Sequence, residues 1–137
     1  MSESLLEQAR AHLATTLGTI PGTSVHDRYP AKVTPPAVVC LPGDPYVEHD
    51  PDNMPYGHGW LRFEVVLIVA NATNPEQDRR LDDLICQVWA ELLSAPAPIR
   101  WWPLSVDRPS PLELNDTTYL HTRVQVRAPW RTIPTSN

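Results

Sequence analysis

The chain has 137 residues, a length that fits one domain and leaves little room for a second. A hydrophobic fraction of 42% and a charged fraction of 20% are typical of a globular protein and exclude an intrinsically disordered one. The net charge is −5 and there is no run of Lys or Arg, which argues against nucleic acid or an anionic membrane as the main partner.

Features of the sequence also indicate where the protein resides. The only cysteines, Cys40 and Cys86, are expected to be free, buried thiols in a reducing compartment. Glu3 and Glu7 interrupt any apolar run near the start, so we expect no signal peptide. The longest apolar run, Val65 to Ala70, is too short to span a bilayer. The sequence therefore predicts a protein that stays in the cytoplasm where it is made.

The first predicted element is an amphipathic helix. Ser4 and Glu7 have the spacing of a capping box, which predicts that the helix begins after Ser4. Gly18 and Pro21 predict its end. Between these limits, apolar side chains recur at helical spacing: Leu6, Ala9, Leu13 and Leu17.

Two short strands and a long loop are expected next. Val25 to Tyr29 and Val38 to Leu41 have the composition of strands, and a Pro-Gly pair follows the second of them. Residues 44–59 are then predicted to form a long polar loop, because they include three prolines and two glycines. A loop of this length inside a compact domain is usually functional or disordered.

The clearest strand and the clearest helix lie in the middle of the chain. Trp60 to Ala70 alternates as a strand does, with Arg62 and Glu64 on the polar face. Its apolar face carries Leu61, Phe63, Val65, Leu67 and Val69. Asn74 and Pro75 then predict a helix start. The helix has a continuous apolar stripe, formed by Leu81, Leu84, Ile85, Val88, Trp89, Leu92 and Leu93.

Two further strands are predicted near the end of the chain. Trp102 to Arg108 is the first, after which Pro109 and Pro111 are expected to interrupt regular structure. Thr117 to Ala128 is a long alternating strand, and the tail beyond about residue 130 is expected to fray. The element order predicts a single α+β domain over residues 1–137. We expect a mostly antiparallel sheet of about four to five strands with two amphipathic helices packed on it.

The sequence contains no recognisable catalytic machinery. It has no glycine-rich phosphate loop, no nucleophile elbow and no zinc-protease helix, so we expect neither an enzyme nor a bound cofactor. One segment with metal-binding residue types contains Glu48, His49, Asp50, Asp52 and His58. Their spacing matches no known ligand pattern, and short polar side chains are also what a turn requires. The turn interpretation is favoured over a metal site.

The polar face of the last strand and the tryptophans are candidates for contacts with a partner. Arg123 and Arg127 share a face with Tyr119 and His121. This row fits an anion clamp, a solvated sheet face or a surface that meets a partner's acidic groups. Trp101 and Trp102 should point to opposite faces, so one of them is expected to be exposed. Tryptophan is enriched at interface hot spots, but it also seals the ends of small cores.

The layout of the whole chain resembles the tail terminator proteins of long-tailed bacteriophages. The features that carry the resemblance are the N-terminal helix, the segment Val25 to Pro30, the segment Pro35 to Val39 and the sequence from Leu41 to Tyr46. The apolar strand Phe63 to Ala70 and the helix Asp78 to Leu93 then follow in the same order. The proline-rich stretch from Ala95 to Pro111 departs from this pattern.

The resemblance implies a non-enzymatic structural protein of the virion, made in the cytoplasm of a host bacterium. Copies would form a ring, expected to be a hexamer, at the head-proximal end of the tail, between the major tail tube protein and the head connector. A neighbouring neck protein is the alternative within the same assembly, and a small metal-dependent hydrolase is the alternative outside it. Candidate interface residues are Asp44, Tyr46, Glu48, Asp50, Asp52, Trp60, Trp101, Tyr119, His121, Arg123 and Arg127.

Overall fold

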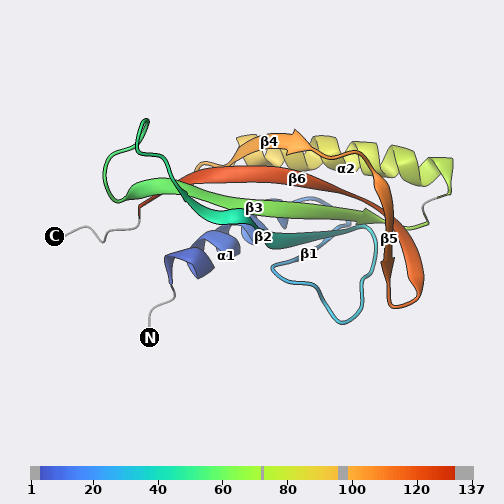
Figure 1. Ribbon diagram of the computed structural model, residues 1–137. Helices are drawn as coiled ribbons and strands as arrows, with labels where there is room; N and C mark the ends of the chain where they lie inside the picture. Colours follow the sequence, from blue (N-terminus) through green and yellow to red (C-terminus); the bar gives the residue numbers. More distant parts are fainter. Residues whose placement is uncertain (1–3, 72, 96–98, 132–137) are drawn as a thin grey trace.

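The computed structural model describes residues 4–71, 73–95 and 99–131. These residues form two helices and a six-stranded, mostly antiparallel sheet, so the predicted α+β class is confirmed with one strand more than expected (Figure 1). The strands are β1 (Ser24–His26), β2 (Ala37–His49), β3 (His58–Val69), β4 (Trp102–Val106), β5 (Ser110–Leu114) and β6 (Thr117–Arg131).

The sheet is built around two long central strands, β3 and β6. The strand order is β1-β2-β3-β6-β4, and β5 pairs with the start of β6. β1 is parallel to β2, whereas every other pair is antiparallel. Residues Asn115 and Asp116 have positive φ angles of 49° and 65° between β5 and β6, as expected for a tight hairpin turn. Because β4 is the last strand in this order, it is an edge strand.

Both helices begin at side-chain caps that the sequence predicts. In α1 (Leu5–Leu17), the Ser4 hydroxyl accepts a hydrogen bond from the Glu7 backbone N–H at 3.1 Å. In α2 (Pro75–Leu93), the Asn74 side chain accepts one from the Glu76 N–H at 2.9 Å. Such caps satisfy N–H groups that have no partner within the helix. Among the described residues, no helix combines the length and the apolar character needed to cross a membrane.

The two helices cover the same face of the sheet and enclose the main core. The predicted inward face of β3, Leu61 to Val69 in alternation, is fully buried there, as are Leu81, Leu84, Val88 and Leu92 of α2. The apolar stripe of α2 was expected to include Leu93, but Leu93 is 67% exposed. Leu93 is the last residue of the helix.

The opposite face of the sheet has a small second core at one end only. Val39 of β2 and Val66 and Ile68 of β3 are buried there, together with Val33 from the preceding loop. Leu112 of β5 packs against this cluster, and so does Tyr119 of β6. The remainder of the face has neither helix nor hairpin over it, and this is where the polar side chains gather.

Two segments predicted to be irregular contain strand residues. Half of the expected loop at 44–59 is β-structure, because β2 continues to His49 and β3 begins at His58, whereas residues 50–57 lie outside the strands. A register shift between Pro42 and Val47 accommodates the prolines before pairing resumes at Val47 and Leu61. Pro111 likewise lies within β5, which pairs along one side with β6, and prolines are tolerated in such an edge position. The predicted frayed tail lies beyond β6, outside the described residues.

Candidate protein interface

The uncovered part of the sheet carries a strip of polar and aromatic side chains. We call it the polar strip and define it by Glu48, Trp60, Arg62, Glu64, Trp102, Arg123, Gln125 and Arg127. Neighbouring strands place these residues side by side, since Arg62 is opposite Arg127 and Glu64 is opposite Gln125. The strip contains three arginines and two glutamates. It therefore carries a positive charge on a chain whose net charge is negative.

Ion pairs within the subunit neutralise most of the polar strip. An Arg123 guanidinium nitrogen lies 2.8 Å from one Glu64 oxygen, and the Gln125 amide donates to the other at 3.0 Å. Arg62 is 3.5 Å from Glu48 on β2. Arg123 thus has a carboxylate partner on the adjacent strand, so its charge is already paired within the subunit.

Arg127 is held by aromatic rings rather than by a carboxylate. Its guanidinium carbon lies 3.9 Å from the centre of the Trp60 ring and 5.9 Å from that of Trp102. The two tryptophan rings meet edge to face, with centroids 6.1 Å apart. Cation–π contacts of this kind orient an arginine without cancelling its charge. Arg127 is therefore the arginine of the polar strip whose charge is not paired with a glutamate of the strip.

The hairpin between β2 and β3 extends beyond both helices and β4 at one end of the molecule (Figure 1). We call residues 47–61 the β2–β3 arm. The Asp50 carboxylate accepts hydrogen bonds at 3.2 Å from the Trp60 indole and from the Asn53 side chain. His49 Nδ1 lies 3.1 Å from the His58 carbonyl oxygen, to which it donates in the tautomer that carries its hydrogen on Nδ1. Tyr56 at the tip is 88% exposed.

These contacts support the turn interpretation of the acidic segment. Asp50 and His49 bond to groups of the arm itself, and Glu48 pairs with Arg62. Among the described residues, no three His, Cys, Asp or Glu side chains lie close enough together to hold a metal ion. The acidic segment is part of a structured arm with an exposed tyrosine at its tip.

Acid should loosen the tip of the arm. The hydrogen bonds from Trp60 and then Asn53 hold the pKa of Asp50 below the usual value for an aspartate. Because the pKa of Asp50 is lower in the folded state, these bonds stabilise the arm fully at pH values above the unfolded-state pKa. This stabilisation is lost as the pH falls through the folded-state pKa. We expect the Trp60 indole N–H resonance to shift in an NMR titration with a midpoint below the usual pKa of an aspartate. In Asp50→Asn this titration should disappear; its persistence would show that another group is responsible.

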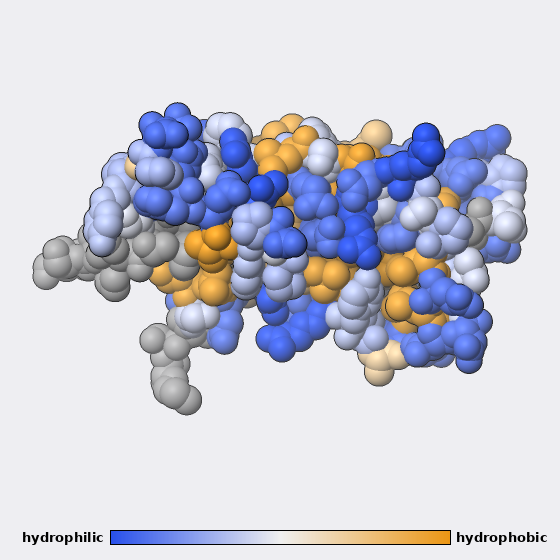
Figure 2. Space-filling model, in the orientation of Figure 1, coloured by the Kyte–Doolittle hydropathy of each residue, from blue (hydrophilic) through white to orange (hydrophobic). Residues whose placement is uncertain are grey.

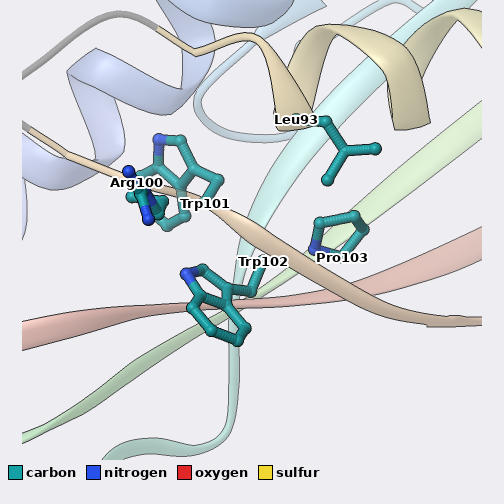
Figure 3. A pocket seen from close by; sticks show the side chains of 5 residues that line it. All are labelled: Leu93, Arg100, Trp101, Trp102 and Pro103. Carbon is teal, nitrogen blue, oxygen red and sulfur yellow. The ribbon is translucent and has the colours of Figure 1, made fainter.

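A shallow hollow lies beside β4, at the end of α2. It has a volume of about 410 Å³ and is lined by Leu93, Arg100, Trp101, Trp102 and Pro103. Figure 3 shows Leu93 reaching from the end of α2 toward Pro103, with Trp101 and Trp102 on opposite sides of the strand. Leu93, Trp102 and Leu104 are 67%, 44% and 38% exposed, so apolar surface continues along this edge.

The structure separates the predicted interface residues into exposed and internal ones. Asp44 and Asp52 are exposed. Trp101 is only 1% exposed and belongs to the core, which corrects its assignment as an exposed contact residue. Tyr46 packs edge to face on Phe63, with centroids 5.5 Å apart. His121 is buried with its Nδ1 2.8 Å from the Ser110 carbonyl oxygen, so it does not belong to a partner-facing row.

Tyr56 and Leu93 are exposed, but neither was among the candidates. A signal for Tyr56 was present, because an aromatic between Pro55 and Gly57 in a turn has no strand or helix face through which to reach a core. The side of the molecule in Figure 2 shows separate hydrophobic patches among hydrophilic surface, rather than one continuous apolar area. Exposed apolar side chains clustered at one edge indicate a contact site more strongly than isolated ones do.

Comparison with known proteins does not assign the chain to a family. No protein-family model matches the sequence, and no curated protein matches it.

Proposed function

We propose that the protein is a structural component of a long-tailed phage virion that caps the head-proximal end of the tail tube. Copies of the chain form a ring, with six as the expected number. The ring matches the end of the tube on one side, which stops further addition of the major tail protein. Its other side offers a surface for the head connector. This role depends on the shape of the ring and on its contacts with the tube and the connector, and it requires no catalytic group or cofactor.

The observation that carries the proposal is the β2–β3 arm. The tip of the arm, which extends beyond the helices and carries an 88% exposed tyrosine, contributes little to the core of its own subunit. Large aromatic side chains are instead enriched in the contacts between proteins. Together with the similarity of the element order to tail terminators, the arm favours a subunit of an assembly over an independent monomer.

A subunit with two dissimilar contact surfaces is suited to ring formation. Contacts that join one surface to a different surface on the next copy are heterologous, and they close into a ring when the rotation per subunit permits. The arm and the hollow beside β4 are two such surfaces, one projecting and one recessed. A ring of this kind uses the same contact between every pair of neighbours.

Electron microscopy of the purified protein mixed with tail tubes tests the proposal. The tubes are to be assembled from the major tail protein of the same virus. We expect rings bound at one end of each tube and no further elongation when tube protein is added. Bovine serum albumin at equal concentration serves as the control. Binding to isolated head connectors but not to tube ends would identify a neighbouring neck protein instead, and normal elongation of the tubes would contradict the capping role.

A further inference from the structure

We propose that Tyr56, at the tip of the β2–β3 arm of one copy, inserts into the hollow beside β4 of the next copy. The inference rests on the proposed function, because it names the contact that joins neighbours in the ring. It commits to a second copy of this chain as the occupant of the hollow. The two surfaces differ, so the contact runs in one direction around the ring.

The backbone of the arm holds Tyr56 in a defined position. Gly57 has a φ angle of 83°, a conformation that favours glycine, immediately after Tyr56. A Cβ at Gly59 would lie 2.5 Å from the Glu48 carbonyl oxygen, so only glycine permits this close approach of the two arm strands. The Asp50 hydrogen bonds brace the same turn. A pre-organised arm loses little conformational freedom on docking, which favours association.

The hollow provides the surroundings that a tyrosine side chain requires. Leu93 and Pro103 provide apolar surface, Trp102 provides an aromatic ring, and Arg100 provides a hydrogen-bond donor and a positive charge. A tyrosine ring can pack against the first three, while its hydroxyl faces the polar group. Tyr56 does not fill the hollow of its own subunit, because it is 88% exposed.

Insertion of a side chain suits this edge of the sheet better than addition of a strand. β4 has one unpaired edge, but Pro103 has no backbone N–H to donate. The register between β4 and β6 also shifts between Pro103 and Ser105. Prolines and bulges of this kind discourage edge-to-edge pairing of strands. The apolar side chains along β4 are therefore the surface available to a neighbour.

Charge complementarity favours the arm of a second copy as the occupant. Residues 44–57 contain Asp44, Glu48, Asp50 and Asp52 and no Lys or Arg. Arg100 lines the hollow, and Trp102 connects the hollow to the positively charged polar strip through its contact with Arg127. An acidic arm approaching a basic recess gains in encounter rate and in correct register.

Directed disulfide formation tests the contact in the full chain. Tyr56→Cys and Leu93→Cys are made separately in a Cys86→Ser background, because Cys86 is exposed and Cys40 is buried. After mild oxidation, a mixture of the two variants should give covalent dimers on a non-reducing gel, whereas neither variant alone should. The double variant should give a ladder of oligomers. Tyr29→Cys, which also replaces an exposed tyrosine, is the control and should not link to Leu93→Cys.

The outcomes distinguish this contact from the capping role. Absence of dimers in the mixture, or dimers of Tyr56→Cys with itself, overturns the proposed contact. If capped tubes form without the cross-link, the contact fails while the function stands. If the cross-link forms but tubes continue to elongate, the function fails while the contact stands.

Removal of the tyrosine gives a second, quantitative measurement. Tyr56→Ala should weaken self-association about 30-fold or more, as expected for an interface hot spot. The thermal melting of its monomer should match that of the wild-type monomer, because the side chain is 88% exposed. Tyr29→Ala should leave association unchanged. Sedimentation measures both variants, and equal association of Tyr56→Ala and wild type would overturn the proposal.

Discussion

Replacing Trp101 with alanine should lower the free energy of unfolding by about 3–5 kcal/mol, the usual cost of deleting a large buried aromatic side chain. Trp101 is 1% exposed and packs edge to face against Phe63, with centroids 5.7 Å apart. Its indole N–H also donates to His12 Nδ1 at 3.0 Å, which ties the start of β4 to α1. Urea unfolding followed by circular dichroism measures the loss.

The adjacent tryptophan provides a matched control. Trp102 is 44% exposed and meets Trp60 and Arg127 on the other side of the sheet, so Trp102→Ala should cost much less stability. Trp101→Phe retains much of the ring packing but removes the hydrogen bond to His12, and it should fall between the two alanine variants. Equal losses for Trp101→Ala and Trp102→Ala would contradict the assignment of one tryptophan to the core and the other to the surface.

The parts of the fold that local patterns determine could be predicted from the sequence. The alternation from Leu61 to Val69 defined the buried face of β3, because side chains in a strand alternate strictly between two faces. Asn74 and Pro75 defined the start of α2 through local capping chemistry. The predictions of these two elements were correct because the residues that determine each of them lie close together in the sequence.

The arm was missed because its signals are not local. Prolines and polar residues in 44–59 predicted a loop, yet β2 pairs with β3 again from Val47 onward. That pairing depends on a register shift and on the absence of a Cβ at Gly59. The pattern of polar and apolar residues along the sequence indicates neither of them. β5 was missed for the same reason, since Pro111 is compatible with a strand only where the edge is free.

The candidate interface could be predicted only in outline. Strand alternation correctly placed Arg123 and Arg127 on one face and the two adjacent tryptophans on opposite faces. It did not reveal that Glu64 pairs with Arg123, because the contact joins residues that are far apart in sequence. Alternation also cannot say which of two adjacent residues points inward. That choice depends on where the helices pack, and Trp101 points toward them.

The helical position of Cys86 shows the same limitation. It was expected to be buried beside Ile85, but Cys86 is exposed on the outer side of α2. Leu84 and Val88 occupy the inward positions of the helix around it. Cys40, by contrast, lies on the inward face of β2 in the main core. Both cysteines were predicted to be buried, but only Cys40 is buried and Cys86 is exposed.

Thiol reagents should consequently modify Cys86 and leave Cys40 intact in the native protein. Burial, with a smaller contribution from the negative charge of Asp27, raises the pKa of Cys40 from 9.0 to about 12, and Arg10 opposes the rise. A shift of this size lowers the reactive thiolate fraction at neutral pH about a thousandfold, before restricted access is considered. Because the folded-state pKa is the higher one, the neutral thiol's contribution to stability is complete below about pH 9 and is lost as pH rises toward 12. Alkylation followed by mass spectrometry should find one modified cysteine in the native wild type, none in Cys86→Ser and two in the unfolded wild type. Comparable rates at the two native cysteines would show that β2 does not bury Cys40 in the core.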